Sequence, residues 1–149
     1  MKKLIIVRKF QPEDFSSVIE IEKKVFDEHD PFYYMKFYET CSEGFLVAEF
    51  DGIVAGFVVG YRVSEKTGRI FSLAVNPEYQ NLGIGGALLN EIMRLLRENK
   101  VYEVVLEVRQ SNTRAKRFYE RYGFYVEGIS ERYYNDGENA YLMKIRLRY

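Results

Sequence analysis

The most informative part of the sequence runs from Leu73 to Leu96 and reads LAVNPEYQNLGIGGALLNEIMRLL. It begins inside a short apolar run, residues 70–75, which is typical of a buried strand. Asn76-Pro77 ends this strand, because proline lacks a backbone donor and disfavours helix at the residue before it. Beyond the glycines, apolar residues recur at helical spacing, and these are Ile84, Leu88, Ile92, Leu95 and Leu96. The pattern predicts a strand, a loop and a helix in succession.

The loop of this stretch, residues 80–86, has the features of an anion-binding site. The first N–H groups of a helix have no partner within the helix and lie at the positive end of its dipole, so they bind phosphate. Gly83 and Gly85 carry no Cβ, which would let a ligand approach the backbone closely. The spacing matches neither the dinucleotide-binding fingerprint nor the Walker A loop. On these residues alone, an ordinary glycine turn stays open as the alternative.

Length and composition restrict the class of protein. The chain has 149 residues, which suits one domain that we place at 1–149. Lysine plus arginine and aspartate plus glutamate both number 22, and zero net charge argues against a nucleic-acid partner. A single cysteine, Cys41, fits a reducing compartment. We find no signal-peptide pattern and no apolar run long enough for a membrane, so we expect a cytoplasmic protein without a membrane partner.

The rest of the chain alternates between strand and helix signals. Strands are expected at residues 4–8, 45–50, 53–63, 69–75, 101–108, 124–128 and 141–147. Helices are expected at about 12–26, at 32–41, from Ile84 onward, and from a cap at Ser111 or Asn112 to about Tyr122. Asp51-Gly52 indicates a two-residue hairpin, residues 66–68 a turn, and Gly56 or Gly60 a bulge. These signals predict an α+β fold, with a central mixed sheet of about seven strands and helices on both faces.

Two motifs together resemble a known family. Gln80-x-x-Gly83-x-Gly85, after a Leu-Ala-Val-x-Pro strand end, is similar to motif A of the GNAT superfamily of acyl-CoA-dependent N-acetyltransferases. The block 106–124, LEVRQSNTRAKRFYERYGF, looks like the RimI-like branch of that family, the protein N-terminal (ribosomal protein alanine) acetyltransferases. The segment 132–143, RYYNDGENAYLM, fits the same branch. The resemblance covers nearly the whole chain and implies a GNAT-like fold.

The resemblance also implies acetyl-CoA as the cofactor, with CoA as product. The strand end would pair with the pantetheine arm through its backbone, and the loop amides would hold the pyrophosphate. The positions concerned are Leu73, Ala74, Val75, Gln80, Asn81, Leu82, Gly83, Ile84, Gly85 and Gly86, with Asn112 and Tyr119 on the cofactor arm. Asn81-Leu82 stands where the family commonly has a basic pair. We therefore expect fewer side-chain cations at the phosphates, and a CoA affinity that rests more on backbone amides.

The implied reaction is direct transfer of an acetyl group from the thioester to a free amine, which attacks only when it is neutral. A general base must take the amine proton, and an acid can protonate the leaving thiolate. Glu107, the charged residue of an apolar strand, matches the family base, and Tyr119 matches the family acid near the CoA sulfur. The alternatives are a solvent-facing glutamate at a strand end and a core tyrosine. The base could act directly or through a water molecule.

The resemblance implies a protein or peptide N-terminus as the acceptor, with ribosomal proteins among the candidates. Phe26, Tyr33, Tyr133 and Tyr134 would line the peptide entrance, and an ordinary aromatic core or lid is the alternative. Acetylation of a small amine or of a lysine side chain stays open, as does a non-catalytic CoA-binding regulatory module. Because His29 and Cys41 are the only residues of their types, we expect no metal site.

Overall fold

The computed structural model describes residues 4–26 and 30–149 of the chain. His29 therefore lies outside the described residues. The seven strands are β1 (Ile5–Lys9), β2 (Phe45–Phe50), β3 (Ile53–Arg62), β4 (Thr67–Val75), β5 (Glu103–Arg109), β6 (Tyr125–Ser130) and β7 (Ala140–Arg146). The helices are α1 (Phe15–Val25), α2 (Phe32–Thr40), α3 (Ile84–Glu98) and α4 (Thr113–Arg121), with short 3-10 turns at Pro12–Asp14, Ser42–Gly44 and Pro77–Tyr79.

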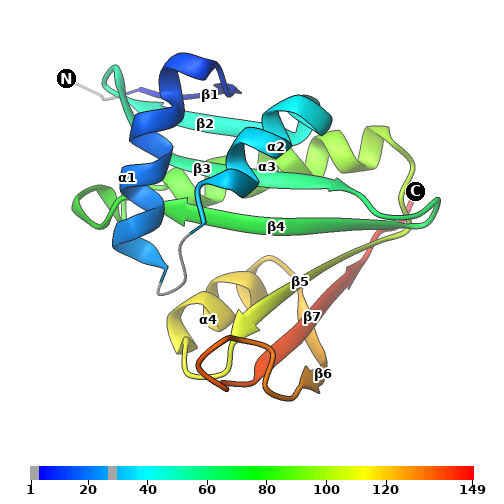
Figure 1. Ribbon diagram of the computed structural model, residues 1–149. Coiled ribbons are helices and arrows are strands. Elements are labelled where there is room, and N and C mark those ends of the chain that lie inside the picture. The colour runs from blue at the N-terminus through cyan, green and yellow to red at the C-terminus, as the bar shows by residue number, and fades with distance from the viewer. Residues whose placement is uncertain (1–3, 27–29) are drawn as a thin grey trace.

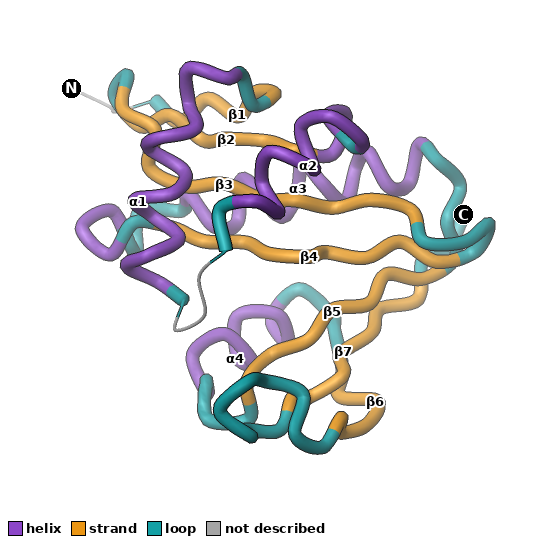
Figure 2. Tube along the Cα trace, in the orientation of Figure 1, coloured by secondary structure: helices purple, strands orange, loops and turns teal. Residues whose placement is uncertain are grey.

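The strands form one mixed sheet in the order β1-β2-β3-β4-β5-β7-β6 (Figure 1). Strands β1 to β4 are antiparallel neighbours, whereas β4 and β5 pair in parallel. Helices α1 and α2 cover one face of the sheet, and α3 and α4 cover the other (Figure 2). The predicted seven-stranded mixed sheet with helices on both faces is confirmed.

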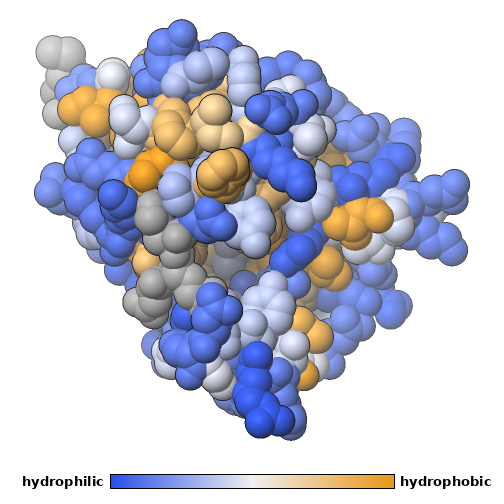
Figure 3. Space-filling model, viewed as in Figure 1, coloured by the Kyte–Doolittle hydropathy of each residue, from blue (hydrophilic) through white to orange (hydrophobic). Residues whose placement is uncertain are grey.

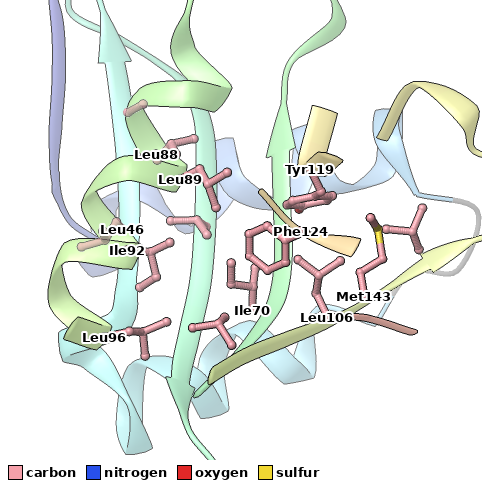
Figure 4. Close-up of a cluster of buried hydrophobic side chains, with 14 of the residues drawn as sticks. Leu46, Ile70, Leu88, Leu89, Ile92, Leu96, Leu106, Tyr119, Phe124 and Met143 are labelled. Carbon is pink, nitrogen blue, oxygen red and sulfur yellow. The ribbon is translucent and has the colours of Figure 1, made fainter. Parts of the chain in front are cut away.

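The core of the α3 face is built from the helical stripe that the sequence indicates. Leu88, Leu89 and Ile92 are at most 1% exposed and point from α3 toward the sheet (Figure 4). Leu89 takes a buried place that the spacing did not predict, and Leu95 is only partly buried. Truncating one such leucine to alanine typically costs about 2–5 kcal/mol. This packing fixes the N-terminus of α3 against the end of β4.

Several local predictions are confirmed at their turns and bulges. Asp51 and Gly52 both have positive φ, 53° and 81°, as a two-residue hairpin turn requires. The pairing of β3 with β4 shifts at Gly60, so that Phe71 forms a bulge, and the pairing of β2 with β3 shifts beside Gly56. The predicted turn at 66–68 is wrong, because Thr67 and Gly68 already belong to β4 and Gly68 pairs with Arg62.

The feature that positions the site is the divergence of β4 from β5. The two strands pair only over Thr67–Arg69 and Glu103–Val105. Beyond these residues the strands separate, as Figure 1 shows. Beyond Arg69, β4 therefore pairs with β3 along one edge. Its other edge, from Ile70 to Val75, pairs with no described strand.

Candidate active site

The divergence of the two strands opens a cavity of about 1550 Å³. Its lining comes from the separated parts of β4 and β5, the start of α3, helix α4, the loop between β6 and β7, the C-terminal end of α1 and the start of α2. All but one of the predicted site residues line this single cavity. The exception is Leu82, whose side chain is exposed, although its neighbours Asn81 and Gly83 both line it.

At one end of the cavity the backbone is arranged for an anion. Gly83 is the N-cap of α3 and has φ of +88°, a conformation that favours glycine. The first backbone bond of the helix runs from the Ala87 N–H to the Gly83 carbonyl, at 3.1 Å. The N–H groups before Ala87 thus remain available at the positive end of a fifteen-residue helix.

Two further glycines allow the side chains of helix α4 and its C-cap to approach the backbone at the start of α3. A Cβ added to Gly86 would lie 2.2 Å from the Tyr122 hydroxyl, and one added to Gly85 would lie 3.4 Å from the Phe118 ring. Helix α4 therefore packs directly on the first turn of α3. Of the two predicted caps, Ser111 and Asn112, it is Asn112 whose side chain accepts a hydrogen bond from the Ala115 N–H, at 3.1 Å.

Helix α4 also brings cations that the sequence reasoning missed. Arg114 and Arg121 line the cavity, and Arg114 Nη2 donates to the Asn81 side-chain oxygen at 3.2 Å. The expectation of fewer cations was drawn from the loop residues alone. The neighbouring helix α4 brings Arg114 to this loop, 33 residues after its partner Asn81.

In the middle of the cavity, Glu107 extends from β5. Its side chain is 18% exposed and accepts two hydrogen bonds on Oε2, from Arg69 Nη2 at 3.1 Å and from Arg69 Nε at 3.3 Å. Burial lowers the pKa of Arg69, but its charged and phenolic neighbours, Glu107 first among them, raise it above the usual value overall. The Glu107 carboxyl group thus lies inside the cavity and is held from one side by a cation.

Tyr119 reaches the same cavity from α4. It is 7% exposed and packs edge-on against Phe118 and Phe124, in the cluster shown in Figure 4. Burial raises the pKa of its phenol far above the ordinary value, so the hydroxyl keeps its proton at neutral pH. Among the described residues none forms a hydrogen bond with this hydroxyl. The group is a protonated donor that faces the cavity.

The loop between β6 and β7 closes the other end of the cavity with two tyrosines. The rings of Tyr133 and Tyr134 meet edge-on at 4.9 Å, and burial raises the pKa of Tyr134 to about 12. Arg109 fixes this loop: its guanidinium lies 4.0 Å from the Tyr134 ring centre and pairs with Asp136 and Glu138 at 2.9 Å each. Neither Arg109 nor Arg69 was assigned a role from the sequence.

The opposite wall at this end belongs to α1, α2 and β4. Phe26 and Tyr33 line the cavity as predicted, and the Tyr33 ring lies 5.5 Å from that of Phe71, the bulged residue of β4. Apolar side chains also gather on the surface between α1 and α2 (Figure 3), and Phe32 at the start of α2 is 82% exposed. The end of the cavity that carries the tyrosines is therefore aromatic on both sides.

Glu22 of α1 is an unexpected member of this wall. It is 2% exposed, lines the cavity, and adds to the rise that burial causes in the pKa of Tyr34. No role was assigned to Glu22 from the sequence.

Among the described residues, no group of three or more His, Cys, Asp or Glu could hold a metal ion. Nor is any helix in the described ranges long and apolar enough to cross a membrane.

The chain is similar to known proteins over most of its length. Residues 9–124 match the model of the acetyltransferase (GNAT) family. An N-alpha-acetyltransferase of Sulfurisphaera tokodaii is 37% identical, over 92% of this chain and 90% of the relative. A putative ribosomal protein bS18-alanine N-acetyltransferase of Bacillus subtilis is 33% identical, over 99% of both chains.

Solved structures show the same architecture. Ard1 from Thermoplasma volcanium superposes with a TM-score of 0.93 at 34% identity, over 97% of this chain and 99% of the other. Naa20 from Chaetomium thermophilum, solved in complex with a bisubstrate analogue, has a TM-score of 0.87 at 25% identity, over 95% and 86% of the two chains.

Proposed function

Because this chain belongs to the acetyltransferase (GNAT) family, we propose that it transfers an acetyl group from acetyl-CoA to the α-amino group of a protein or peptide N-terminus. One observation carries the proposal. A single cavity holds an anion-binding helix start at one end, a carboxylate and a protonated phenol in the middle, and an aromatic mouth at the other end. Relatives named N-alpha-acetyltransferases support the choice of acceptor.

The residues present fit acetyl-CoA. Its pyrophosphate would be held by the free N–H groups at the start of α3, with Arg114 beside them. The unpaired edge of β4 at Leu73, Ala74 and Val75 offers backbone partners for an extended amide-bearing arm. When bound, acetyl-CoA supplies the activated acetyl group as a thioester.

The acceptor would enter from the aromatic end. Phe26 and Tyr33 on one wall, with Tyr133 and Tyr134 on the other, leave a mouth suited to an extended peptide end. An α-amino group has a reference pKa of about 8, against about 10.4 for lysine, so it loses its proton more readily near neutral pH. Newly made proteins, ribosomal proteins among them, present such groups in the cytoplasm, where we propose that the enzyme acts.

Glu107 is the proposed general base. Arg69 donates only to Oε2 of Glu107, and no described residue donates to Oε1. Oε1 can therefore accept the amine proton, directly or through a water molecule. The neutral amine then has a lone pair for attack on the acetyl carbon. Tyr119 is the proposed general acid, because it is buried, protonated and on the wall that would face the departing sulfur.

Replacing Tyr119 by phenylalanine should lower kcat by about 10- to 100-fold, at the lower end of what proton transfer usually contributes. The ring packing against Phe118 and Phe124 is kept, so the Kd of acetyl-CoA should stay within about twofold of the wild-type value. Steady-state kinetics with a peptide acceptor and a binding titration measure the two quantities. Tyr125→Phe, a surface tyrosine outside the cavity, is the control. A wild-type kcat in Tyr119→Phe would remove this residue from the mechanism.

A panel of acceptors tests the function itself. We expect acetylation of peptides with a free N-terminus and none of the same peptides when the N-terminus is blocked and an internal lysine is the only amine. Mass spectrometry of the products locates the acetyl group. Acetylation of blocked peptides only would show a lysine acetyltransferase. Binding of acetyl-CoA without transfer to any peptide or small amine in the panel would favour the regulatory module.

A further inference from the structure

Arg69 is a charged residue at the point where β4 and β5 part. It is the last residue of β4 that pairs with β5, opposite Val105. Because side chains alternate along a strand, Glu107, two residues beyond Val105, lies on the same face of β5 as Val105. Arg69 thus stands at the base of the cavity, directly beside the carboxylate that we propose as the general base.

Three groups of the cavity meet on the Arg69 guanidinium. Nε and Nη2 donate to Glu107 Oε2, and Nη2 also donates to the Tyr133 hydroxyl at 3.1 Å. The guanidinium carbon lies 5.7 Å from the centre of the Phe71 ring. The carboxylate, the tyrosine of the late loop and the aromatic wall of the mouth are therefore joined through one side chain.

Partial burial of the Arg69–Glu107 ion pair limits how much the pair can stabilise the fold, which points to a role beyond stability. The Arg69 and Glu107 side chains are 26% and 18% exposed, and removing paired charges from water offsets much of their attraction. A planar guanidinium, unlike an ammonium group, fixes the direction of each hydrogen bond that it donates. A carboxylate held by two donors on one oxygen keeps its other oxygen in a fixed direction.

We propose that Arg69 is a positioning residue, which sets the Glu107 carboxylate and the Tyr133 hydroxyl in one arrangement toward the acceptor amine. The inference rests on the proposed acetyl transfer. In this role Arg69 touches neither the acetyl group nor the amine. It keeps Oε1 of Glu107 aimed into the cavity and couples the base to the acceptor mouth, so that a peptide seated against Tyr133 meets a carboxylate that is already oriented.

Kinetics of Arg69→Lys and Arg69→Met test this role. Lysine keeps the charge but loses the planar fork, and methionine loses both. We expect kcat to fall by about 10- to 100-fold in both variants, as small misplacements of catalytic groups do. The Kd of acetyl-CoA should stay within about twofold, because Arg69 lies away from the glycine loop. Arg62→Met, an exposed arginine of β3 outside the cavity, is the matched control and should keep wild-type kinetics.

A double variant separates positioning from a merely structural role. If Arg69 acts through Glu107, kcat of Arg69→Met/Glu107→Gln should equal that of Glu107→Gln alone, within about twofold. Three results would overturn the inference. They are a loss of kcat in the double variant equal to the product of the two single losses, a wild-type kcat in Arg69→Lys, and a joint loss of acetyl-CoA binding and folding. Failure of the wild-type enzyme to acetylate any peptide would instead count against the proposed function, so the two failures are distinguishable.

Discussion

Glu107→Gln should lower kcat for a peptide acceptor at pH 7 by about 10²- to 10⁴-fold, the range usual for the loss of a general base. Glutamine keeps the size of the side chain, and its oxygen can still accept from Arg69, but an amide cannot take a proton from the amine. The change therefore removes basicity and leaves the cavity in place. Steady-state kinetics measure kcat, and titration with acetyl-CoA should give a Kd within about twofold of the wild-type value.

The pH dependence makes this prediction specific. The α-amino group of the acceptor is increasingly neutral above its reference pKa of about 8, and a neutral amine needs less help from a base before attack. The deficit of Glu107→Gln should therefore shrink as the pH rises through this region. Glu103→Gln is the control, because Glu103 lies on the same strand, pairs with Lys144 at 3.5 Å and does not line the cavity. A wild-type kcat in Glu107→Gln at pH 7 would exclude Glu107 as the base.

Gly83→Asp should weaken binding of CoA by about 10- to 100-fold, which corresponds to a loss of about 1.4 to 2.8 kcal/mol of binding free energy. Gly83 has φ of +88° at the N-cap of α3, so any side chain there strains the backbone. A Cβ meets nothing closer than Ile5, at 3.9 Å, so the space itself permits the substitution. The carboxylate would then occupy the positive end of the helix, where it repels a bound pyrophosphate.

Gly83→Asn is the matched control for the charge. Asparagine has nearly the shape of aspartate and tolerates positive φ better than most residues, but it is neutral. Titrations should show a smaller loss for asparagine than for aspartate. The difference should vanish for an acetylated pantetheine thioester, which lacks the pyrophosphate. Equal Kd values for CoA in wild type and Gly83→Asp would place the phosphates elsewhere in the cavity.

Residues close in the chain determined much of the structure on their own. The glycine loop and the apolar stripe from Ile84 to Leu96 predicted the start and the buried face of α3. Asp51-Gly52 predicted the hairpin, and a cap at Ser111 or Asn112 predicted the start of α4. In each case the cause is local, because turn conformation, capping bonds and helical periodicity involve residues only a few positions apart.

The ends of the strands were less predictable, because they depend on pairing with residues far away in the chain. The turn expected at 66–68 belongs partly to β4, because pairing with β3 and β5 extends the strand through Gly68. No local signal reports that a partner strand continues. The glycine loop, where fewer cations were expected, receives them from α4, whose packing on α3 cannot be inferred from the loop itself.

In the candidate site, too, some residues were identified from the sequence and others only from the tertiary structure. Sequence alone singled out Glu107 and Tyr119, through their place in recognisable blocks, and the tertiary structure brings both to one cavity. Only the tertiary structure decided that Arg69 holds Glu107, 38 residues later, and Tyr133, 64 residues later. Such contacts depend on the order of the strands and on where β4 and β5 stop pairing. These properties are set by the packing of the whole sheet, and no short stretch of the chain carries them.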